Sequence, residues 1–386
     1  MGSQIDSLFK EFNKKYKSEL FTVGTVVHDC SRIPFSSPRA NYMLYGGVPR
    51  GRITEFAGEE GSGKTTTALD IAGNAQKLFK QEWEDQIRDL ESRDKLTKEQ
   101  TAYLVKLRDD GPKKVLWVDC ENTFDDEWST KLGVDVASLC VMSPDSQSAE
   151  EIFGMVHQII DTGEIGLVVI DSLGMMVSQQ EMEKDIEEST YGGISRALTK
   201  FSKKVELSCA KTNCALIGIN QVRDNLNAGY GGPAYTTPGG KCWKHVCSVR
   251  LMFRQGTPFD DKFKDVKKSC ENPFGHKVLI SVQKTKVCKP DRKAGFYTLT
   301  YDNGIEPFID IIDIAINRDV IHQAGAWFTF IDLDSGELIC NTDEDGNTVE
   351  VKVQGQANLI PFLKDEANKD IREMVERYVL KFIEDT

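Results

Sequence analysis

The sequence lacks the features of membrane and secreted proteins. No apolar run within its 386 residues reaches the roughly 18 residues that a membrane-spanning helix needs. The first residues carry neither the basic nor the apolar segment of a signal peptide. The 10 cysteines include no Cys-x-x-Cys pair and the 5 histidines do not gather beside them, so neither a zinc site nor a disulfide framework is indicated. We therefore expect a cytoplasmic protein with reduced thiols.

An excess of basic charge is missing as well, since the formal net charge is −12. The negative charge is concentrated near the C-terminus, where residues 310–386 hold 17 acidic and 7 basic side chains. Residues 1–309 therefore sum to only −2. Because local basic loops on this larger part can still bind phosphates, the net charge does not exclude a nucleic-acid partner.

Apolar runs that alternate with longer helical stretches predict an α/β fold. Four of these runs are bounded by Gly, Asp or Asn, as buried parallel strands are. The alternation favours a mostly parallel central sheet with helices on both faces, followed by a meander. The parallel strands are expected at 53–57, 115–119, 166–171 and 215–220, and the meander at 250–253, 277–283 and 296–301.

Three domains are expected along the chain. Residues 1–35 hold an amphipathic helix at 4–20, which could pack on its own core or dock on a neighbouring subunit. Residues 36–305 form the core, with a charged helical hairpin inserted at about 78–112. The remainder, 306–386, is a small acidic domain that mixes short strands with a closing helix at 365–384.

The strongest motif is a phosphate-binding loop. Residues 58–66 match G-x-x-x-x-G-K-[ST] and lie between an expected strand and an expected helix at 66–78. The glycines let backbone N–H groups turn around phosphates, and the helix N-terminus adds partial positive charge. Lys64 should reach the β- and γ-phosphates, and Thr65 should bind Mg²⁺. The nucleotide-binding candidates of this loop are Gly58, Glu59, Glu60, Gly61, Ser62, Gly63, Lys64, Thr65 and Thr66.

Two acidic residues at strand ends would complete such a site. Asp171 ends an apolar strand and is expected as the second protein ligand of Mg²⁺. Glu121 comes just after the strand at 115–119, where ligands of open α/β sheets bind. Glu121 is therefore placed to polarise an attacking water, although a solvated turn residue is the alternative.

These motifs together resemble the RecA family of DNA recombinases. The resemblance covers roughly residues 40–330, the hairpin excepted. It implies an ATPase with a RecA-like core that uses ATP and Mg²⁺, forms filaments on single-stranded DNA, and catalyses homologous pairing and strand exchange in recombination and repair. Implied partners are single- and double-stranded DNA, further copies of the chain, and single-strand-binding and loading proteins. The matching segments are 47–53, 58–66, 118–121, 169–172, 219–223 and 324–327.

The resemblance also implies roles for single residues at the nucleotide. Glu121 matches the catalytic glutamate, and Gln221 matches the glutamine that senses the γ-phosphate. Lys284 and Lys286 resemble paired lysines that reach the ATP of a neighbouring subunit, so that the active site is complete only in a filament. The further nucleotide-binding positions are Asp125 and Trp128 at the adenine, Ser172 beside the metal aspartate, and Tyr301.

Two segments look like the DNA-binding loops of that family. The first spans 185–199 and leads into a helix, and the second, 223–240, is rich in Gly, Asn and Pro. Large side chains in the second could stack on bases, at about 1–3 kcal/mol per base. The DNA-binding candidates are Arg196, Thr199, Lys203, Arg223, Leu226, Tyr230, Gly239 and Gly240.

The chain also departs from the family. His245 stands where familiar members have an interface phenylalanine, the first DNA loop is strongly acidic, and the hairpin is unusual. These departures indicate a divergent member, from a bacterium or a phage. Two other functions stay open on the residues alone: a hexameric, helicase-like motor with the same core, and a recombination mediator that uses ATP only as a switch.

Overall fold

The computed structural model divides the chain into two compact units, Met1–Ser31 and Arg32–Thr386. Its described residues are 4–16, 30–183, 193–224, 235–342 and 347–384. The first unit holds helix α1 (Gln4–Tyr16), which confirms the predicted amphipathic helix; its last predicted positions lie outside the described residues. None of the described helices combines the length and the apolar character that crossing a bilayer requires.

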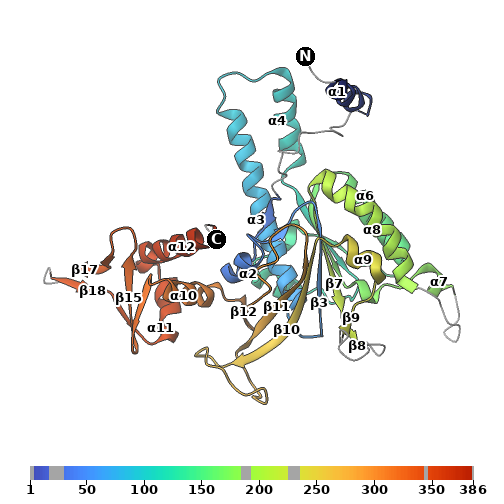
Figure 1. Ribbon diagram of the computed structural model, residues 1–386. Coiled ribbons are helices and arrows are strands. Elements are labelled where there is room, and N and C mark those ends of the chain that lie inside the picture. The colour runs from blue at the N-terminus through green and yellow to red at the C-terminus, as the bar shows by residue number, and fades with distance from the viewer. Residues whose placement is uncertain (1–3, 17–29, 184–192, 225–234, 343–346, 385–386) are drawn as a thin grey trace. The chain divides into compact units, whose positions relative to one another are not determined.

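The second unit is built on a nine-stranded mixed sheet with the order β13-β12-β11-β10-β3-β7-β6-β4-β5 (Figure 1). Neighbouring strands from β5 to β10 are parallel, and β10 to β13 form the antiparallel meander, which confirms the predicted α/β class. The strands are β3 (Ile53–Gly58), β4 (Lys114–Asp119), β5 (Cys140–Met142), β6 (Ile165–Asp171), β7 (Ala215–Gln221), β10 (Val249–Phe259), β11 (Gly275–Thr285), β12 (Ala294–Thr300) and β13 (Gly304–Ile305).

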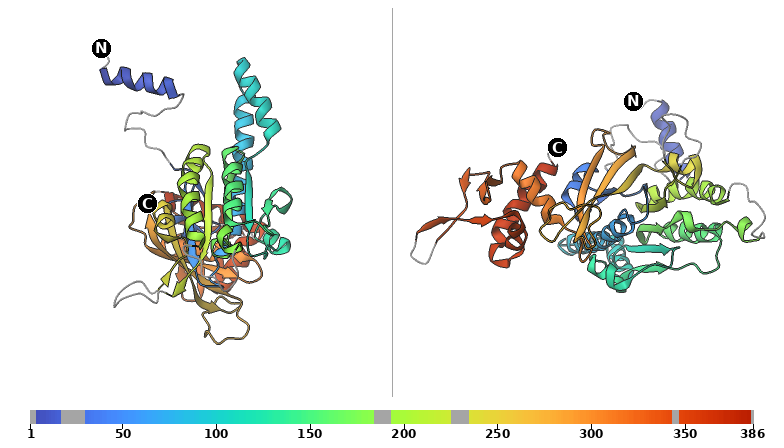
Figure 2. Two further views of the ribbon diagram at one scale, coloured as in Figure 1. Left: turned by 90° about the vertical axis from the view of Figure 1, so that its right-hand side faces the viewer. Right: turned by 90° about the horizontal axis from the view of Figure 1, so that it is seen from below.

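Both faces of this sheet are buried. Successive strand residues point to opposite faces, so Val169 joins one apolar cluster while Val168 joins the other. Helix α3 covers the first face, and helices α6 (Ala149–Asp161) and α8 (Gly193–Thr212) cover the second (Figure 2). This two-sided burial explains why the parallel strands read as nearly continuous apolar runs.

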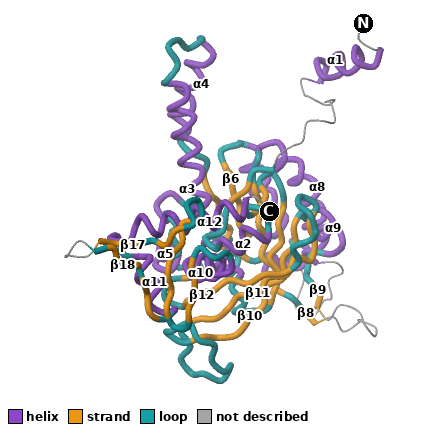
Figure 3. Tube along the Cα trace, turned by 60° about the vertical axis from the view of Figure 1, so that its left-hand side comes forward, coloured by secondary structure: helices purple, strands orange, loops and turns teal. Residues whose placement is uncertain are grey.

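Helix α3 (Lys64–Glu91) extends far beyond the sheet. The sequence predicted a core helix that ends at residue 78 and a separate hairpin after it; this division is wrong, because α3 is continuous over 28 residues and is itself the first arm of the hairpin. Helix α4 (Lys98–Asp110) returns along it, after the predicted capping box (Figure 3). The Trp83 Nε1 donates to the carbonyl oxygen of Leu107 at 2.7 Å and joins the two arms.

The residues after β13 form a smaller α/β assembly with its own apolar cluster. The predicted closing helix begins later than expected, at Lys369, because a 3₁₀ turn at Glu366–Asn368 precedes it. The domain boundary predicted near residue 306 stays a prediction. The elements are α10 (Pro307–Asn317), β14 (Ile321–Ala324), β15 (Trp327–Asp332), β16 (Glu337–Leu338), β17 (Cys340–Thr342), β18 (Thr348–Glu350), β19 (Lys352–Gln354), α11 (Gln356–Lys364) and α12 (Lys369–Glu384).

Short elements connect the large ones. Strand β1 pairs with β2 ahead of the core, and β8 pairs with β9 at the base of the second predicted DNA loop. These elements are β1 (Arg32–Ile33), α2 (Pro38–Met43), β2 (Val48–Pro49), α5 (Asp126–Lys131), α7 (Gln179–Met182), β8 (Arg223–Asp224), β9 (Tyr235–Thr236) and α9 (Gly240–Val246).

Candidate nucleotide site and DNA-binding segments

The predicted phosphate loop joins β3 to α3 at the carboxyl edge of the parallel strands. Gly61 and Gly63 have φ angles of +69° and +88°, which residues with a Cβ rarely adopt. At Gly58 a Cβ would lie 2.6 Å from the carbonyl oxygen of Phe253 on β10. The backbone path of the loop therefore requires glycine at these three positions.

Lys64 lies at the start of α3 with its ammonium group turned to the loop. Its Nζ donates to the carbonyl oxygen of Glu59 at 2.7 Å and to Ser62 Oγ at 3.4 Å. Burial lowers the pKa of Lys64, while the nearby carboxylates of Asp171 and Glu121 act in the opposite direction. Because the side chain is only 7% exposed, its attraction for an anion is weakly screened by water.

Thr65 and Asp171 meet across the site although they are far apart in the sequence. Thr65 Oγ1 donates to Asp171 Oδ2 at 2.8 Å. Burial raises the pKa of Asp171 to about 6, and the Glu121 carboxylate adds to this rise. A hydroxyl and a carboxylate are the hard oxygen ligands that Mg²⁺ prefers, and a cation would offset the cost of burying the carboxylate. These two residues therefore fit a magnesium ion.

Glu121 is held at the junction of three strand ends. Its Oε1 accepts a hydrogen bond from Ser172 Oγ at 2.6 Å and lies 3.4 Å from the donating Gln221 Nε2. Ser172 follows β6, Gln221 ends β7, and Glu121 itself comes just after β4. The parallel order β4-β6-β7 thus brings the predicted water activator, its neighbour and the predicted sensor together.

A cavity of about 270 Å³ lies over the loop. The side chains of Trp128 and Tyr301 line it. The predicted contact of Trp128 with the adenine stays a prediction. The Asp125 carboxylate instead accepts the backbone N–H of Trp128 at 2.7 Å and caps α5. It does not belong to the described residues of the lining, so its contact positions Trp128. The other lining residues are Glu60, Gly61, Ser62, Gly63, Lys64, Thr65, Thr66, Glu121, Asp171, Ile219, Gln221, His276 and Leu299.

His276 was missed by the sequence reasoning. It lines the cavity, is 3% exposed, and its Nδ1 lies 3.1 Å from the hydroxyl of Tyr301. Burial lowers the pKa of His276, which favours the neutral ring. No motif marks this position, because only the antiparallel register of β11 and β12 brings it to the cavity.

The first DNA-binding candidates share one face of α8. Arg196, Thr199 and Lys203 are spaced by three and four residues, and the two basic side chains are exposed. Helix α9 begins beside α8: a Cβ at Gly239 would lie 2.6 Å from Cδ2 of the buried Leu198. The structure thus brings parts of the two predicted DNA segments side by side.

The rest of the second segment is described only at its ends. Arg223 lies in β8, whose pairing with β9 closes the base of the segment, and Gly240 begins α9 with a φ of +71°. Leu226 and Tyr230 lie outside the described residues, as do 185–192 of the first segment.

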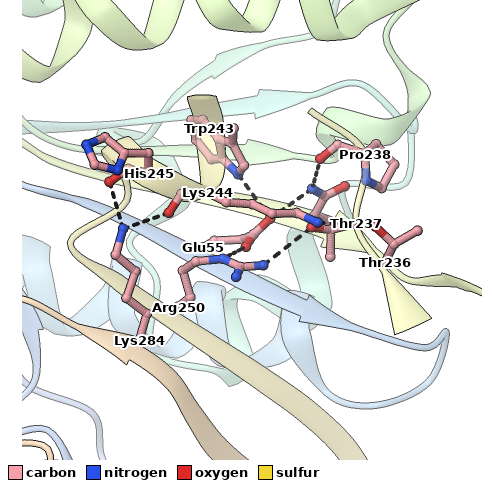
Figure 4. Close-up of polar contacts among 10 residues, drawn as sticks. Glu55, Thr236, Thr237, Pro238, Trp243, Lys244, His245, Arg250 and Lys284 are labelled. Atoms are coloured by element: carbon pink, nitrogen blue, oxygen red, sulfur yellow. Dashed lines mark hydrogen bonds and ion pairs between the residues drawn. The ribbon is translucent and has the colours of Figure 1, made fainter. Parts of the chain in front are cut away.

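The structure places Lys284 and Lys286 outside the lining of the nucleotide cavity of their own chain. Neither belongs to the described residues that line it. Lys284 Nζ donates to the carbonyl oxygens of Lys244 and His245, each at 2.7 Å, at the end of α9 (Figure 4). The structure therefore does not join the two lysines to the other candidates within one chain.

Comparisons with known proteins agree on one family. The family model described as the RecA N-terminal domain matches residues 87–306. Protein RecA of Chlorobaculum parvum is 33% identical over 327 residues, which cover 84% of this chain and 81% of the relative. Protein RecA of Thermus aquaticus is 32% identical, covering 86% and 84%. Protein RecA of Fusobacterium nucleatum is 31% identical, covering 89% and 76%.

Proposed function

The chain belongs to the RecA family of recombinases, and we propose that its own residues hydrolyse ATP on DNA and so control a helical filament that exchanges homologous strands. Membership of the family implies a DNA-dependent ATPase in general. The proposal for this chain is carried by the meeting of Glu121 with Ser172 and Gln221 beside the phosphate loop. A protein that used ATP only as a switch would not need such a placed carboxylate.

The nucleotide would be held by the loop and by two aromatic side chains. Backbone N–H groups of residues 58–66 and the Lys64 ammonium bind the phosphates, and Trp128 and Tyr301 contact the base. Thr65 and Asp171 are the residues that would hold Mg²⁺, which neutralises charge on the β- and γ-phosphate oxygens when bound.

Hydrolysis would proceed from a water oriented by Glu121. The water oxygen attacks the γ-phosphorus, the bond from this phosphorus to the bridging oxygen of ADP breaks, and the water proton passes to the carboxylate. Ser172 holds the orientation of that carboxylate through its hydroxyl. Lys64 stabilises negative charge that develops on the phosphates.

Coupling to DNA and to the neighbouring subunit would begin at Gln221. This residue lies directly before Val222 and β8, the base of the second DNA segment, so a change at the γ-phosphate can reach the DNA.

We further propose that Lys284 and Lys286 act on the nucleotide of the adjacent copy, since they lie outside the nucleotide cavity of their own chain. Single-strand-binding and loading proteins are the expected further partners.

The first test is ATP hydrolysis by the purified chain with and without single-stranded DNA, with electron microscopy in a non-hydrolysable ATP analogue. We expect stimulation by DNA and helical filaments. Lys64→Ala should abolish turnover, whereas Lys77→Ala, an exposed lysine on the same helix, should not. Near-normal turnover in Lys64→Ala would refute the site, and closed rings would refute the filament.

A further inference from the structure

A buried polar network connects the phosphate-loop strand with the second DNA segment (Figure 4). At its centre is Glu55, which is 0% exposed and lies on β3 three positions before Gly58. Its Oε1 accepts hydrogen bonds from Trp243 Nε1 and Asn220 Nδ2, each at 3.0 Å. Its Oε2 accepts one from Arg250 Nε at 2.5 Å.

The three donors come from three different elements around β3. Asn220 is on β7 and Arg250 on β10, the two strands that flank β3, while Trp243 is on α9. A buried carboxylate is costly unless donors surround it, so these contacts hold one another in place. Glu55 therefore fixes α9 and two strands relative to the strand that leads into the phosphate loop.

The same donors hold the residues that follow the second DNA segment. Asn220 Nδ2 also donates to the carbonyl oxygen of Pro238 at 3.0 Å. Arg250 Nη2 lies 3.5 Å from Thr237 Oγ1. Lys244, next to Trp243, donates from Nζ to Thr236 Oγ1 at 3.1 Å. Each residue from 236 to 238 is thus attached to a partner of Glu55 or to the neighbour of one.

On the nucleotide side the network includes the residue directly before the predicted sensor. Asn220 precedes Gln221, whose amide lies 3.4 Å from Glu121. Asn220 Oδ1 is buried and has no hydrogen-bond partner among the described residues. Its amide cannot flip without turning this oxygen towards the two acceptors, Glu55 and Pro238. The orientation of Asn220 is therefore fixed by the network.

We propose that Glu55 is a positioning residue that couples the state of the nucleotide site to the position of the DNA-binding segment at residues 235–240. A shift of the β7 end at Gln221 must move Asn220, and Asn220 moves Pro238 and the hydrogen-bonding partners of Glu55. Glu55 acts through these partners and contacts neither nucleotide nor DNA. The inference rests on the proposed function, because it names the device by which nucleotide changes the grip on DNA.

Two variants probe the network at different strengths. Glu55→Gln keeps the shape of the side chain but replaces one carboxylate oxygen by an NH₂ group. Because both oxygens of Glu55 accept hydrogen bonds, the new NH₂ group faces a donor in either orientation and at least one hydrogen bond is lost. Trp243→Phe keeps an aromatic ring in the core and removes the Nε1–H together with part of the buried indole. The matched control is Asp70→Asn, a buried carboxyl group on α3 that accepts from the Ser36 backbone N–H at 3.0 Å on the other face of the sheet.

The measurement is the affinity for a labelled single-stranded oligonucleotide, by fluorescence anisotropy, with ADP and with a non-hydrolysable ATP analogue. The affinity for the analogue without DNA is measured beside it. The quantity compared is the ratio of the DNA affinity with the analogue to the DNA affinity with ADP. In the wild type we expect these two affinities to differ by about tenfold or more, a common size for such coupling. Glu55→Gln should reduce this ratio to less than about threefold at unchanged analogue affinity, Trp243→Phe should give an intermediate ratio, and Asp70→Asn the wild-type ratio.

An unchanged ratio in Glu55→Gln would overturn the inference. A loss of affinity for the analogue as large as the loss of coupling would also overturn it, because it would indicate a general structural defect. If circular dichroism shows that Glu55→Gln is unfolded, Trp243→Phe decides, and its wild-type ratio would overturn the inference. A wild type whose DNA affinity ignores the nucleotide would refute the proposed function instead.

Discussion

Replacing Glu121 by Gln separates the basicity of this side chain from its position. Glu121 Oε1 accepts from Ser172 Oγ at 2.6 Å and from Gln221 Nε2 at 3.4 Å. A glutamine at 121 presents an amide oxygen of the same reach, so both contacts can persist. The change then removes the proton acceptor and the charge and leaves the surroundings in place.

The expected size follows from the single function that is lost. A placed general base contributes about 10²- to 10⁴-fold to a rate, or roughly 3–5 kcal/mol in the activation free energy. The kcat of Glu121→Gln should fall within this range. Nucleotide affinity should stay within about threefold, because Lys64 and the loop are unchanged.

The assay is steady-state release of phosphate at saturating ATP and DNA, together with equilibrium binding of a fluorescent nucleotide. Ser172→Ala is the companion variant: it keeps the carboxylate but removes one hydrogen bond to a charged group, which is worth about 1.5–3 kcal/mol. Its kcat should fall by less than that of Glu121→Gln. A kcat within about threefold of wild type in Glu121→Gln would refute the water-activating role.

Three further outcomes follow from other contacts. Burial raises the pKa of Asp310 to about 7. Between pH 4 and 7 the folded state therefore keeps a proton on this carboxyl group that the unfolded state releases near pH 3.8. The free energy of unfolding should fall as pH rises through this range. Asp310→Asn should flatten this fall in urea titrations, and a parallel slope would contradict the assignment. Trp83→Ala removes the bond to Leu107 and should lower the unfolding free energy by about 1–3 kcal/mol at unchanged ATP turnover; equal stability would show that the hairpin arms do not depend on it. Lys284→Ala should lower DNA-stimulated turnover by about tenfold or more at unchanged nucleotide affinity of the unassembled chain, and full stimulation would exclude its action on a neighbour.

The nucleotide site could be predicted because its parts are local in the sequence. Residues 58–66 are one contiguous loop, and Asp171 and Glu121 each come at the end of an apolar run. Parallel strands bring such ends to one edge of a sheet, so their meeting follows from the fold class. The sequence could not give the contacts between them, because the order β4-β6-β7 is a matter of topology.

The length of α3 and the places of His276 and Glu55 could not be predicted from the pattern of apolar residues. The break predicted at residue 78 follows from the change to a charged surface, but Lys, Glu and Gln are good helix formers, and nothing ends α3 before Ser92. His276 depends on the pairing register of two strands. Glu55 is a single acidic residue within an apolar run. The sequence does not show that donors from three separate elements bind its carboxylate, because only the folded structure brings them together.

Helix α3 is continuous from the phosphate loop to the hairpin tip. Its 28 residues, at 1.5 Å each, make a rod of about 42 Å that carries Lys64 at one end and the hairpin tip at the other. If the whole helix tilted by about one degree about its Lys64 end, its far end at the hairpin tip would move by about 0.7 Å. Small adjustments around the phosphates would thus be magnified at the outer surface, where a dye on the exposed Arg93 position could follow nucleotide binding without entering the site.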